Sequence, residues 1–314
     1  MSVRDVLKEI SEIKSRRLHS YAFTELEARL RSIEEGFKRL KADDNELVKY
    51  FPVAMIAVVE SYFRQSIQQL IDVGDPFAAQ AAGLAGQVKI DYEMLKAIGG
   101  RATTIGELIG HSVKLSRFDQ LNSCVSTVIG QSFTRFLESA PDRWEVEINN
   151  RKDARILNNA QQVFSSVGAL FEARHIICHE SAAAFSLDVA RTKELMDGCF
   201  EFLLASEKAF MYLMDPNAPL TQTEMNFSAY ESLRAVEETL EKKIAAIRDQ
   251  LEASTLQEFN NAQMLWEGFR DAWVMYKVGP EEEGGSIWPL EFCGEMKFLV
   301  RDRLSQLSWS RDEI

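Results

Sequence analysis

The chain has 314 residues and carries 48 acidic against 36 basic side chains, a net charge of −12 at neutral pH. This acidic balance excludes a protein that binds nucleic acid non-specifically over its whole surface, so any RNA-binding groove must be locally basic. The low counts of glycine (16) and proline (7), together with many residues that favour helices, predict an all-α fold.

The first 44 residues predict one long helix or a helical hairpin with a break near Ser20. Apolar side chains recur at helical spacing on both sides of that break: Val6, Ile10, Ile13, then Leu26, Leu30, Ile33, Phe37 and Leu40. Mixed charge flanks both stripes, which is typical of a helix that docks on a neighbour. We expect residues 1–44 to pack on a helical bundle formed by residues 45–214.

No feature of the chain predicts export or membrane insertion. Residues 1–9 are amphipathic and mixed in charge, unlike a signal peptide. The longest apolar run, residues 51–59, is far too short to span a bilayer. The sequence therefore predicts a cytoplasmic protein with no membrane partner.

The segment from Arg174 to His179 holds the most distinctive chemistry of the chain. It reads Arg-His-Ile-Ile-Cys-His at the end of a strongly helical stretch. A guanidinium can hold a phosphate through two parallel hydrogen bonds and stabilise the charge that develops on its oxygens. An imidazole can take or give a proton near neutral pH. These groups are suited to cleaving a phosphodiester without a metal.

Two other interpretations of the histidine pair stay open, a packed or surface pair and a metal site. His175 and His179 are neighbours on one helix face, but a metal site needs two further ligands. Cys178 lies about 60° around the helix from His175 and about 100° from His179, and Glu180 follows directly. Because no second His/Cys cluster exists in the sequence, a closed zinc site is disfavoured. We expect no metal and no other cofactor.

The spacing within the motif favours a dimer. Five residues separate Arg174 from His179, which places them about 140° apart on a regular helix. At that angle the two side chains are expected to converge poorly within one chain. Two copies facing each other across a symmetry axis would place two Arg/His sets around one groove. We therefore expect a homodimer across this motif.

At these positions the sequence resembles the HEPN domain (higher eukaryotes and prokaryotes nucleotide-binding). The residues from Arg174 to His179 match its R-x4-6-H signature, and residues 164–173 resemble the last core helix of that family. Residues 55–64 resemble the family's first core helix. In that helix, Glu60 fits the position of an acidic residue that often faces the site.

Many HEPN members are metal-independent endoribonucleases of toxin or antiviral systems, and the resemblance implies this activity here. His179 would assist proton transfer as the 2′-hydroxyl attacks the adjacent phosphate, and Arg174 would hold the developing charge, so the substrate must be RNA. His175, where Asn is the commoner choice in the family and His and Asp also occur, and Glu60 complete the expected catalytic set. A toxin role implies an antitoxin or trigger as a partner.

Some members of that family are inactive or only bind nucleotides. A non-catalytic nucleotide-binding or regulatory HEPN protein is therefore one alternative function. A helical interaction scaffold with a residual motif is the other.

Charge is distributed unevenly along the chain. Residues 1–214 carry 26 basic and 29 acidic side chains, whereas residues 215–314 carry 10 and 19. The basic residues near the motif in sequence are Arg151, Lys152 and Arg155, which we expect to bind the substrate. The acidic last third could screen that groove, bind a partner, or simply be a solvated surface.

Residues 215–314 predict a separate helical domain. Two prolines and an asparagine interrupt the helical pattern at residues 215–220. Three amphipathic runs follow, each unable to bury its apolar face alone: residues 224–251, 255–278 and 287–307. A charged, glycine-rich turn is expected at residues 279–286.

This last third resembles the lysozyme-inhibitor LprI-like domain. The resemblance rests on the string AQMLWEGFRDA at residues 262–272, on GGSIWPL at residues 284–290, and on Cys293 and residues 301–307. Trp266 and Trp273 are expected in a core stripe. Arg270 and Asp271 would form a structural ion pair or a contact surface.

The cysteines differ from those of exported LprI-like proteins, which carry pairs. Cys293 has no counterpart at the place where a partner is expected, so no disulfide framework is predicted. Cys124, Cys178 and Cys199 lie in apolar helical contexts and are expected to be small buried side chains. Inhibition of a lysozyme in the periplasm is therefore not expected.

Overall fold

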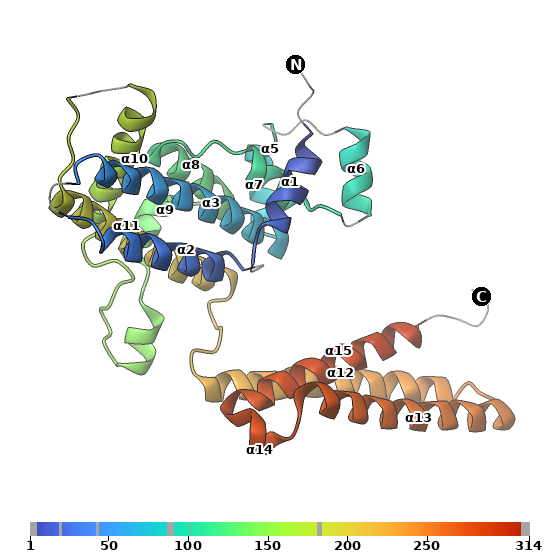
Figure 1. Cartoon of the computed structure of the whole chain (residues 1–314). Helices are drawn as coiled ribbons and strands as arrows, with labels where there is room; N and C mark the ends of the chain where they lie inside the picture. Colours follow the sequence, from blue (N-terminus) through green and yellow to red (C-terminus); the bar gives the residue numbers. More distant parts are fainter. Residues whose placement is uncertain are drawn as a thin grey trace. The chain divides into compact units, whose positions relative to one another are not determined.

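The computed structural model describes residues 5–18, 21–41, 44–86, 91–100, 102–180 and 184–308, except the side chains of residues 282 and 283. This described part consists of helices joined by turns, with no strand, so the all-α prediction is confirmed. The chain divides into two compact units, Met1–Asn217 and Ala218–Ile314 (Figure 1). None of the described helices is both long enough and apolar enough to cross a membrane.

The first unit is built around a long central helix with shorter helices packed on it. Its elements in chain order are α1 Val6–Ser15, α2 Ala22–Phe37, η1 Leu47–Lys49, α3 Tyr50–Val73, α4 Phe77–Gln80, α5 Ala82–Ala85, α6 Tyr92–Gly99, α7 Ile105–Ser112, α8 Phe118–Ile129, α9 Phe133–Ser139, the π-helical turn η2 Trp144–Ile148, α10 Ala160–His179 and α11 Val189–Met214. The predicted break near Ser20 lies outside the described residues.

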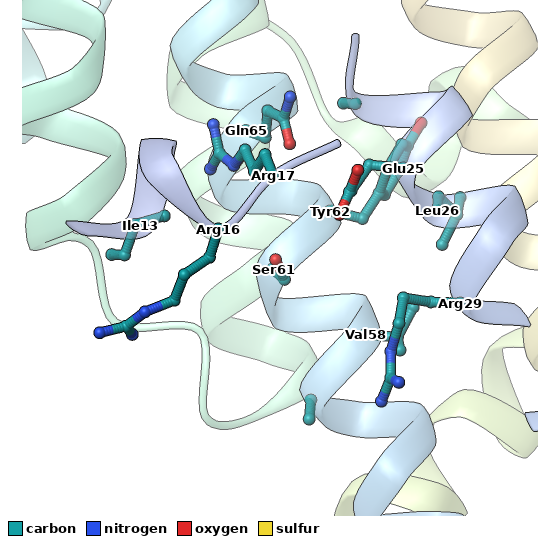
Figure 2. Close-up of a pocket in the computed structure, with 12 residues that line it drawn as sticks. Ile13, Arg16, Arg17, Glu25, Leu26, Arg29, Val58, Ser61, Tyr62 and Gln65 are labelled. Atoms are coloured by element: carbon teal, nitrogen blue, oxygen red, sulfur yellow. The ribbon is translucent and has the colours of Figure 1, made fainter. Parts of the chain in front are cut away.

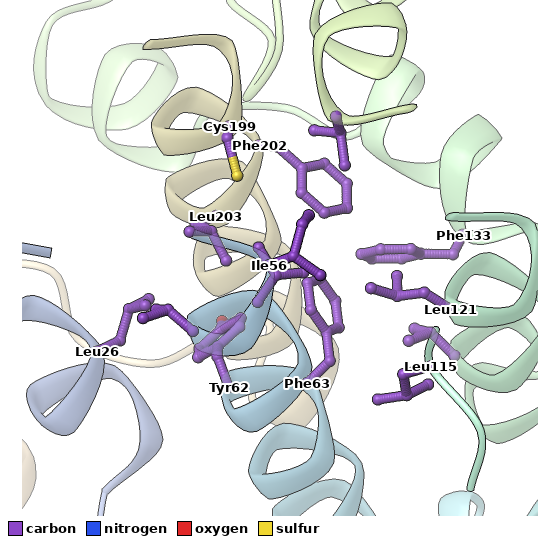
Figure 3. Packing of buried hydrophobic residues seen from close by; sticks show 14 of the residues in the cluster. Leu26, Ile56, Tyr62, Phe63, Leu115, Leu121, Phe133, Cys199, Phe202 and Leu203 are labelled. Atoms are coloured by element: carbon purple, nitrogen blue, oxygen red, sulfur yellow. The ribbon is translucent and has the colours of Figure 1, made fainter. Parts of the chain in front are cut away.

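Helix α3 is the centre of this unit because most of its surface is apolar. It contacts α2, α7, α10 and α11. Phe63 is fully buried and stacks on Phe202 of α11, with ring centroids 5.5 Å apart (Figure 3). Phe133 of α9 stacks in turn on Phe210, also at 5.5 Å. Aromatic pairs at such distances add to the stability from burial alone, so α3, α9 and α11 form one core.

Helices α1 and α2 pack on different parts of the unit. Helix α2 places Leu26, Ile33 and Phe37 in the main core. Helix α1 contributes Ile10 to a separate, smaller cluster with Leu108 of α7. The first predicted segment is therefore two helices, of which only the second belongs to the main core.

Two close helix contacts depend on glycine. A Cβ atom on Gly110 of α7 would lie 2.7 Å from the backbone oxygen of Arg64 in α3. A Cβ atom on Gly198 of α11 would lie 2.6 Å from the Cβ of Ser166 in α10. Both distances are shorter than van der Waals contact, so only glycine lets these backbones approach so closely. The second contact holds α10, which carries the Arg/His motif, against α11.

The second unit has three long helices. They are α12 Gln222–Arg248, α13 Ala253–Val278 and α15 Trp288–Gln306, and α15 contacts both of the others. A capping box between Thr221 and Glu224 begins α12. The predicted turn between the last two long helices also contains two short helical turns, α14 Glu281–Gly284 and η3 Gly285–Ile287. Cys293, Leu233 and Val274 share one of its two small apolar cores.

Candidate functional site

Helix α10 carries the Arg/His motif at its carboxyl end. Val167 and Leu170 are fully buried, so the body of the helix is fixed in the core. Burial decreases toward the end, where Arg174 is half-buried and His175 and His179 are exposed. Because α10 ends at His179, its last carbonyl groups lack partners within the helix. The motif is thus a polar surface on a rigidly anchored helix.

The guanidinium of Arg174 reaches the imidazole of His179 within one chain. Its Nη1 atom lies 3.3 Å from Nε2 of the histidine. The expectation that these side chains converge poorly is therefore wrong. Their Cβ directions do diverge on a regular helix, but the arginine side chain has enough rotatable bonds to cover the difference. A second copy is not required to bring the two groups together.

This contact is a hydrogen bond in one tautomer of His179. Arginine has only donors, so the guanidinium donates to Nε2 when the ring proton is on Nδ1. In that form Nε2 holds the lone pair that a general base needs. A phosphate that attracts the guanidinium of Arg174 would release this lone pair.

His175 and Glu180 complete the exposed cluster. The ring centroids of His175 and His179 are 5.2 Å apart. Nε2 of His175 lies 3.8 Å from Oε1 of Glu180, an attraction that requires a protonated imidazole. The sequence suggests Glu180 only as a possible metal ligand, and its position directly after His179 is the one sequence feature that places it in this cluster. The described residues contain no group of three or more His, Cys, Asp or Glu that could hold a metal ion.

Glu60 lies elsewhere. It lines a cavity on α3 together with Lys14, Arg17 and His111. Among the described residues it makes no hydrogen bond or ion pair with Arg174 or His179. The structure therefore does not join Glu60 to the motif, although both belong to the same unit.

The three basic residues also lie apart from the motif, in a polar hollow of about 590 Å³ beside η2. Arg151 forms an ion pair with Glu145 at 3.2 Å. Arg155 donates from Nη1 to the carbonyl of Ser139 at 2.8 Å, so it holds the base of the loop. Lys152 is exposed and makes no hydrogen bond or ion pair within the described part of the chain. None of the three makes such a bond with Arg174 or His179 in the described residues.

One cysteine prediction is wrong. Cys124, Cys199 and Cys293 are buried free thiols, but Cys178 is exposed. Cys178 follows Phe171 by seven residues and so lies on the same face of α10. The neighbouring helices no longer cover that face at the end of α10, and helical spacing alone cannot show this.

In the second unit, the AQxxW string connects two helices. Gln263 is buried, and its Oε1 accepts from Nε and Nη2 of Arg303 in α15, at 3.2 and 3.1 Å. The guanidinium groups of Arg303 and Arg270 lie 5.5 and 5.3 Å from the ring centre of Trp266. Arg270 also pairs with Asp271 at 2.7 Å. These residues stabilise the packing of α13 on α15.

The opposite face of α13 is apolar and exposed. Trp273 was expected in the core, but 38% of its surface is exposed, so this expectation is wrong. Phe269 stacks on it with ring centroids 5.9 Å apart, and Leu265 and Tyr276 are also exposed. The buried side of α13 is narrow and includes Gln263 and Val274. The exposed apolar residues of α13 face solvent, because α15 packs on the opposite side of this helix.

The comparisons with known proteins concern the second unit. A family model described as lysozyme inhibitor LprI matches residues 215–307. No curated protein and no solved structure matches the chain significantly. The C-terminal unit therefore contains an LprI domain, as its sequence predicts. The match does not include residues 45–214, so the HEPN resemblance of the first unit stays a prediction.

Proposed function

We propose that the N-terminal unit is a metal-independent endoribonuclease in which Arg174 and His179 are the catalytic pair. The observation that supports this function best is the 3.3 Å separation between the guanidinium and the imidazole at an exposed helix end. Such a pair can bind a phosphate oxygen and accept a proton from the hydroxyl beside it.

The proposed reaction uses only groups of this cluster. Nε2 of His179 takes the proton of the 2′-hydroxyl, and the resulting oxygen attacks the adjacent phosphorus. The bond from phosphorus to the 5′-oxygen breaks, which leaves a 2′,3′-cyclic phosphate. His175, in its protonated form, gives a proton to the departing 5′-oxygen. Arg174 moves from His179 to the phosphate and stabilises the negative charge on its oxygens.

The histidines of the motif are exposed at a helix end, so a polynucleotide bound there would be covered on one side only. A second copy facing the motif would cover the other side, so the proposed active form is a homodimer. We expect sedimentation to show a dimer at the concentrations that cut RNA. His175→Glu, which places a negative charge on an exposed part of this face, should shift the protein toward monomer. A protein that cuts RNA as a monomer would contradict the shared groove.

Cleavage of total RNA in excess chelator tests the enzyme directly. Arg174→Ala and His179→Ala should each lower the rate of cleavage by about 10²- to 10⁴-fold. Arg174→Ala removes the charge that stabilises the phosphate oxygens, and His179→Ala removes the general base. Cys178→Ser is the matched control, since Cys178 is exposed on the same helical turn. It should cleave like the parent chain. Equal cleavage by all four proteins would indicate a contaminating nuclease and overturn the proposal.

The same proposal places the protein in the cytoplasm, as a toxin or an effector of antiviral defence. The acidic C-terminal unit, which carries 19 acidic and 10 basic side chains, is then the surface on which an antitoxin or a trigger binds. Of the three predicted basic residues, Lys152 makes no hydrogen bond or ion pair within the described part of the chain, and we expect it to bind RNA. Deleting residues 218–314 removes this acidic surface. The deletion should therefore change the response to such a partner and leave the RNA cleavage by Arg174 and His179 unchanged.

A further inference from the structure

Two adjoining cavities lie on the outer face of α3, far in sequence from the Arg/His motif. Their volumes are about 290 and 300 Å³. Both are lined by Ile13, Arg17, Ala57 and Ser61, so they lie side by side, and together they are here named the α3 groove. Residues of α1 and α2, together with Arg16 and Arg17, form one wall, and α7 forms the other. Hollows of this combined size commonly hold small organic ligands.

Small side chains form the floor of the groove, and its inner wall is apolar. Ala57 and Ser61 are exposed on α3, and Figure 2 shows Ser61 at the centre of the cavity. Val58 and Leu26 add apolar surface. The hydroxyl of Tyr62 donates to Glu207 at 2.7 Å, so this side chain offers the groove mainly its ring. A flat or apolar body would find complementary contacts here.

Arg17 supplies a positive charge to the groove. It is half-buried and lines both cavities, yet its guanidinium makes no hydrogen bond within the described part of the chain. Figure 2 shows it extended across the groove toward Gln65. Burial lowers the pKa of Arg17 below its usual value, while Glu107 and Glu25 act in the opposite direction. Unsatisfied donors in such a place cost free energy until an acceptor binds.

The nearby carboxylates already have other partners. Glu107 pairs with Lys14 at 2.7 Å and accepts from Thr103 at 2.8 Å. Glu25 accepts from the backbone amide of Leu18 at 3.1 Å. Both carboxylates act on Arg17 electrostatically, and within the described part of the chain its guanidinium keeps hydrogen-bond donors that an external anion can use.

Glu60 adds a carboxylate oxygen that lacks a hydrogen-bond partner among the described residues. It lines the groove, and its Oε1 is shielded from solvent without a hydrogen-bond partner. The terminal torsion of a glutamate is soft, so a small rotation would turn a carboxylate oxygen into the cavity. A ligand that offers a hydroxyl or an amine at this end would satisfy it. Arg29, which is exposed at the α2 side, adds a second cation.

We propose that the α3 groove binds a small organic anion, a phosphate monoester or a carboxylic acid with an apolar body, whose charged group pairs with Arg17. The apolar body lies over Ala57 and Ser61 against Val58 and Tyr62. A donor group on the ligand meets Glu60. This site is independent of the proposed ribonuclease activity, because Arg174 and His179 do not line it.

Titration of the full chain tests the site with phenyl phosphate, benzoate, phenol and inorganic phosphate, followed by the NMR signals of residues 57–65. Phenyl phosphate or benzoate should bind saturably, and the stronger of the two identifies the charged group. Phenol and inorganic phosphate should each bind about tenfold more weakly, since phenol lacks the anionic group and inorganic phosphate lacks the apolar body.

Two variants and one control locate the binding. Arg17→Gln should weaken it about tenfold or more by removing the charged hydrogen bonds. Ala57→Phe should also block it by filling the groove from an exposed position, which leaves the core intact. Lys38→Gln removes a positive charge at the end of α2, where Lys38 pairs with Glu34 at 2.8 Å and lines neither cavity, and this variant should bind like the parent. Absence of saturable binding by both anions, equal affinity for inorganic phosphate, or binding unchanged by Arg17→Gln and Ala57→Phe would overturn the proposal.

Discussion

At the scale of single residues, the same side-chain type behaves differently according to what surrounds it. Nη1 of Arg174 lies 3.3 Å from Nε2 of His179. Arg303 directs two donors to a buried glutamine, and Arg17 makes no hydrogen bond in the described residues. A half-buried guanidinium without an acceptor is costly, whereas the other two have local partners. These differences distinguish a structural arginine from one that is available to a ligand.

The four cysteines give a prediction at this scale. Cys178 is exposed, whereas burial raises the pKa of the Cys199 thiol to about 12. Because only the thiolate reacts, iodoacetamide at pH 8 should label Cys178 in the native protein, with Cys199 and Cys293 labelled only after unfolding. Mass spectrometry of the labelled peptides measures this. Labelling of Cys199 as fast as Cys178 in the native state would show that α11 is not packed as described.

At the scale of elements, α10 and α13 show how a helix can present functional groups away from the core. The body of α10 is fixed by buried apolar residues and by the close contact of Ser166 with Gly198. Its final turn extends beyond that packing, so the motif is exposed on a rigid support. Helix α13 packs through Gln263 and Val274, and its wider apolar face is turned to solvent.

Two substitutions on α13 test this orientation. Val274 is fully buried, so Val274→Ala should lower the free energy of unfolding of the second unit by about 1–3 kcal/mol through the lost contacts and the cavity. Phe269 is 54% exposed, so Phe269→Ala should change it by less than about 0.5 kcal/mol. Urea denaturation of the two variants measures both values. The reverse order of effects would mean that α13 is rotated about its axis.

At the scale of the whole molecule, the two units have separate apolar cores and different charge. The first core includes residues of α2, α3, α8, α9, α10 and α11, and no residue beyond Asn217. The second unit has its own clusters around Val274 and Val300. Residues 215–314 also carry most of the net negative charge of the chain. Each unit therefore has what a domain needs to fold alone.

Separate fragments test this independence. Residues 1–217 and 218–314, expressed apart, should each give a helical circular dichroism spectrum and a cooperative thermal transition. The transitions should lie within a few degrees of those in the full chain. A fragment without a cooperative transition would show that its core needs the other unit.

The sequence by itself determined the all-α class, the approximate limits of the C-terminal helices and the LprI domain. These depend on local periodicity, capping signals such as Thr221 with Glu224, and one distinctive string around Trp266. It also located Arg174, His175 and His179 on the end of a helix, because that signal is contiguous in the chain.

Only the tertiary structure decided which groups meet. The reach of Arg174 to His179, the exposure of Cys178 and Trp273, and the place of Glu60 in the α3 groove depend on where neighbouring helices stop covering a face. Helical spacing gives the direction of a side chain around its own axis, but it cannot tell whether another element lies there. That coverage is set by packing between segments far apart in the chain, such as α3 against α7 and α10 against α11.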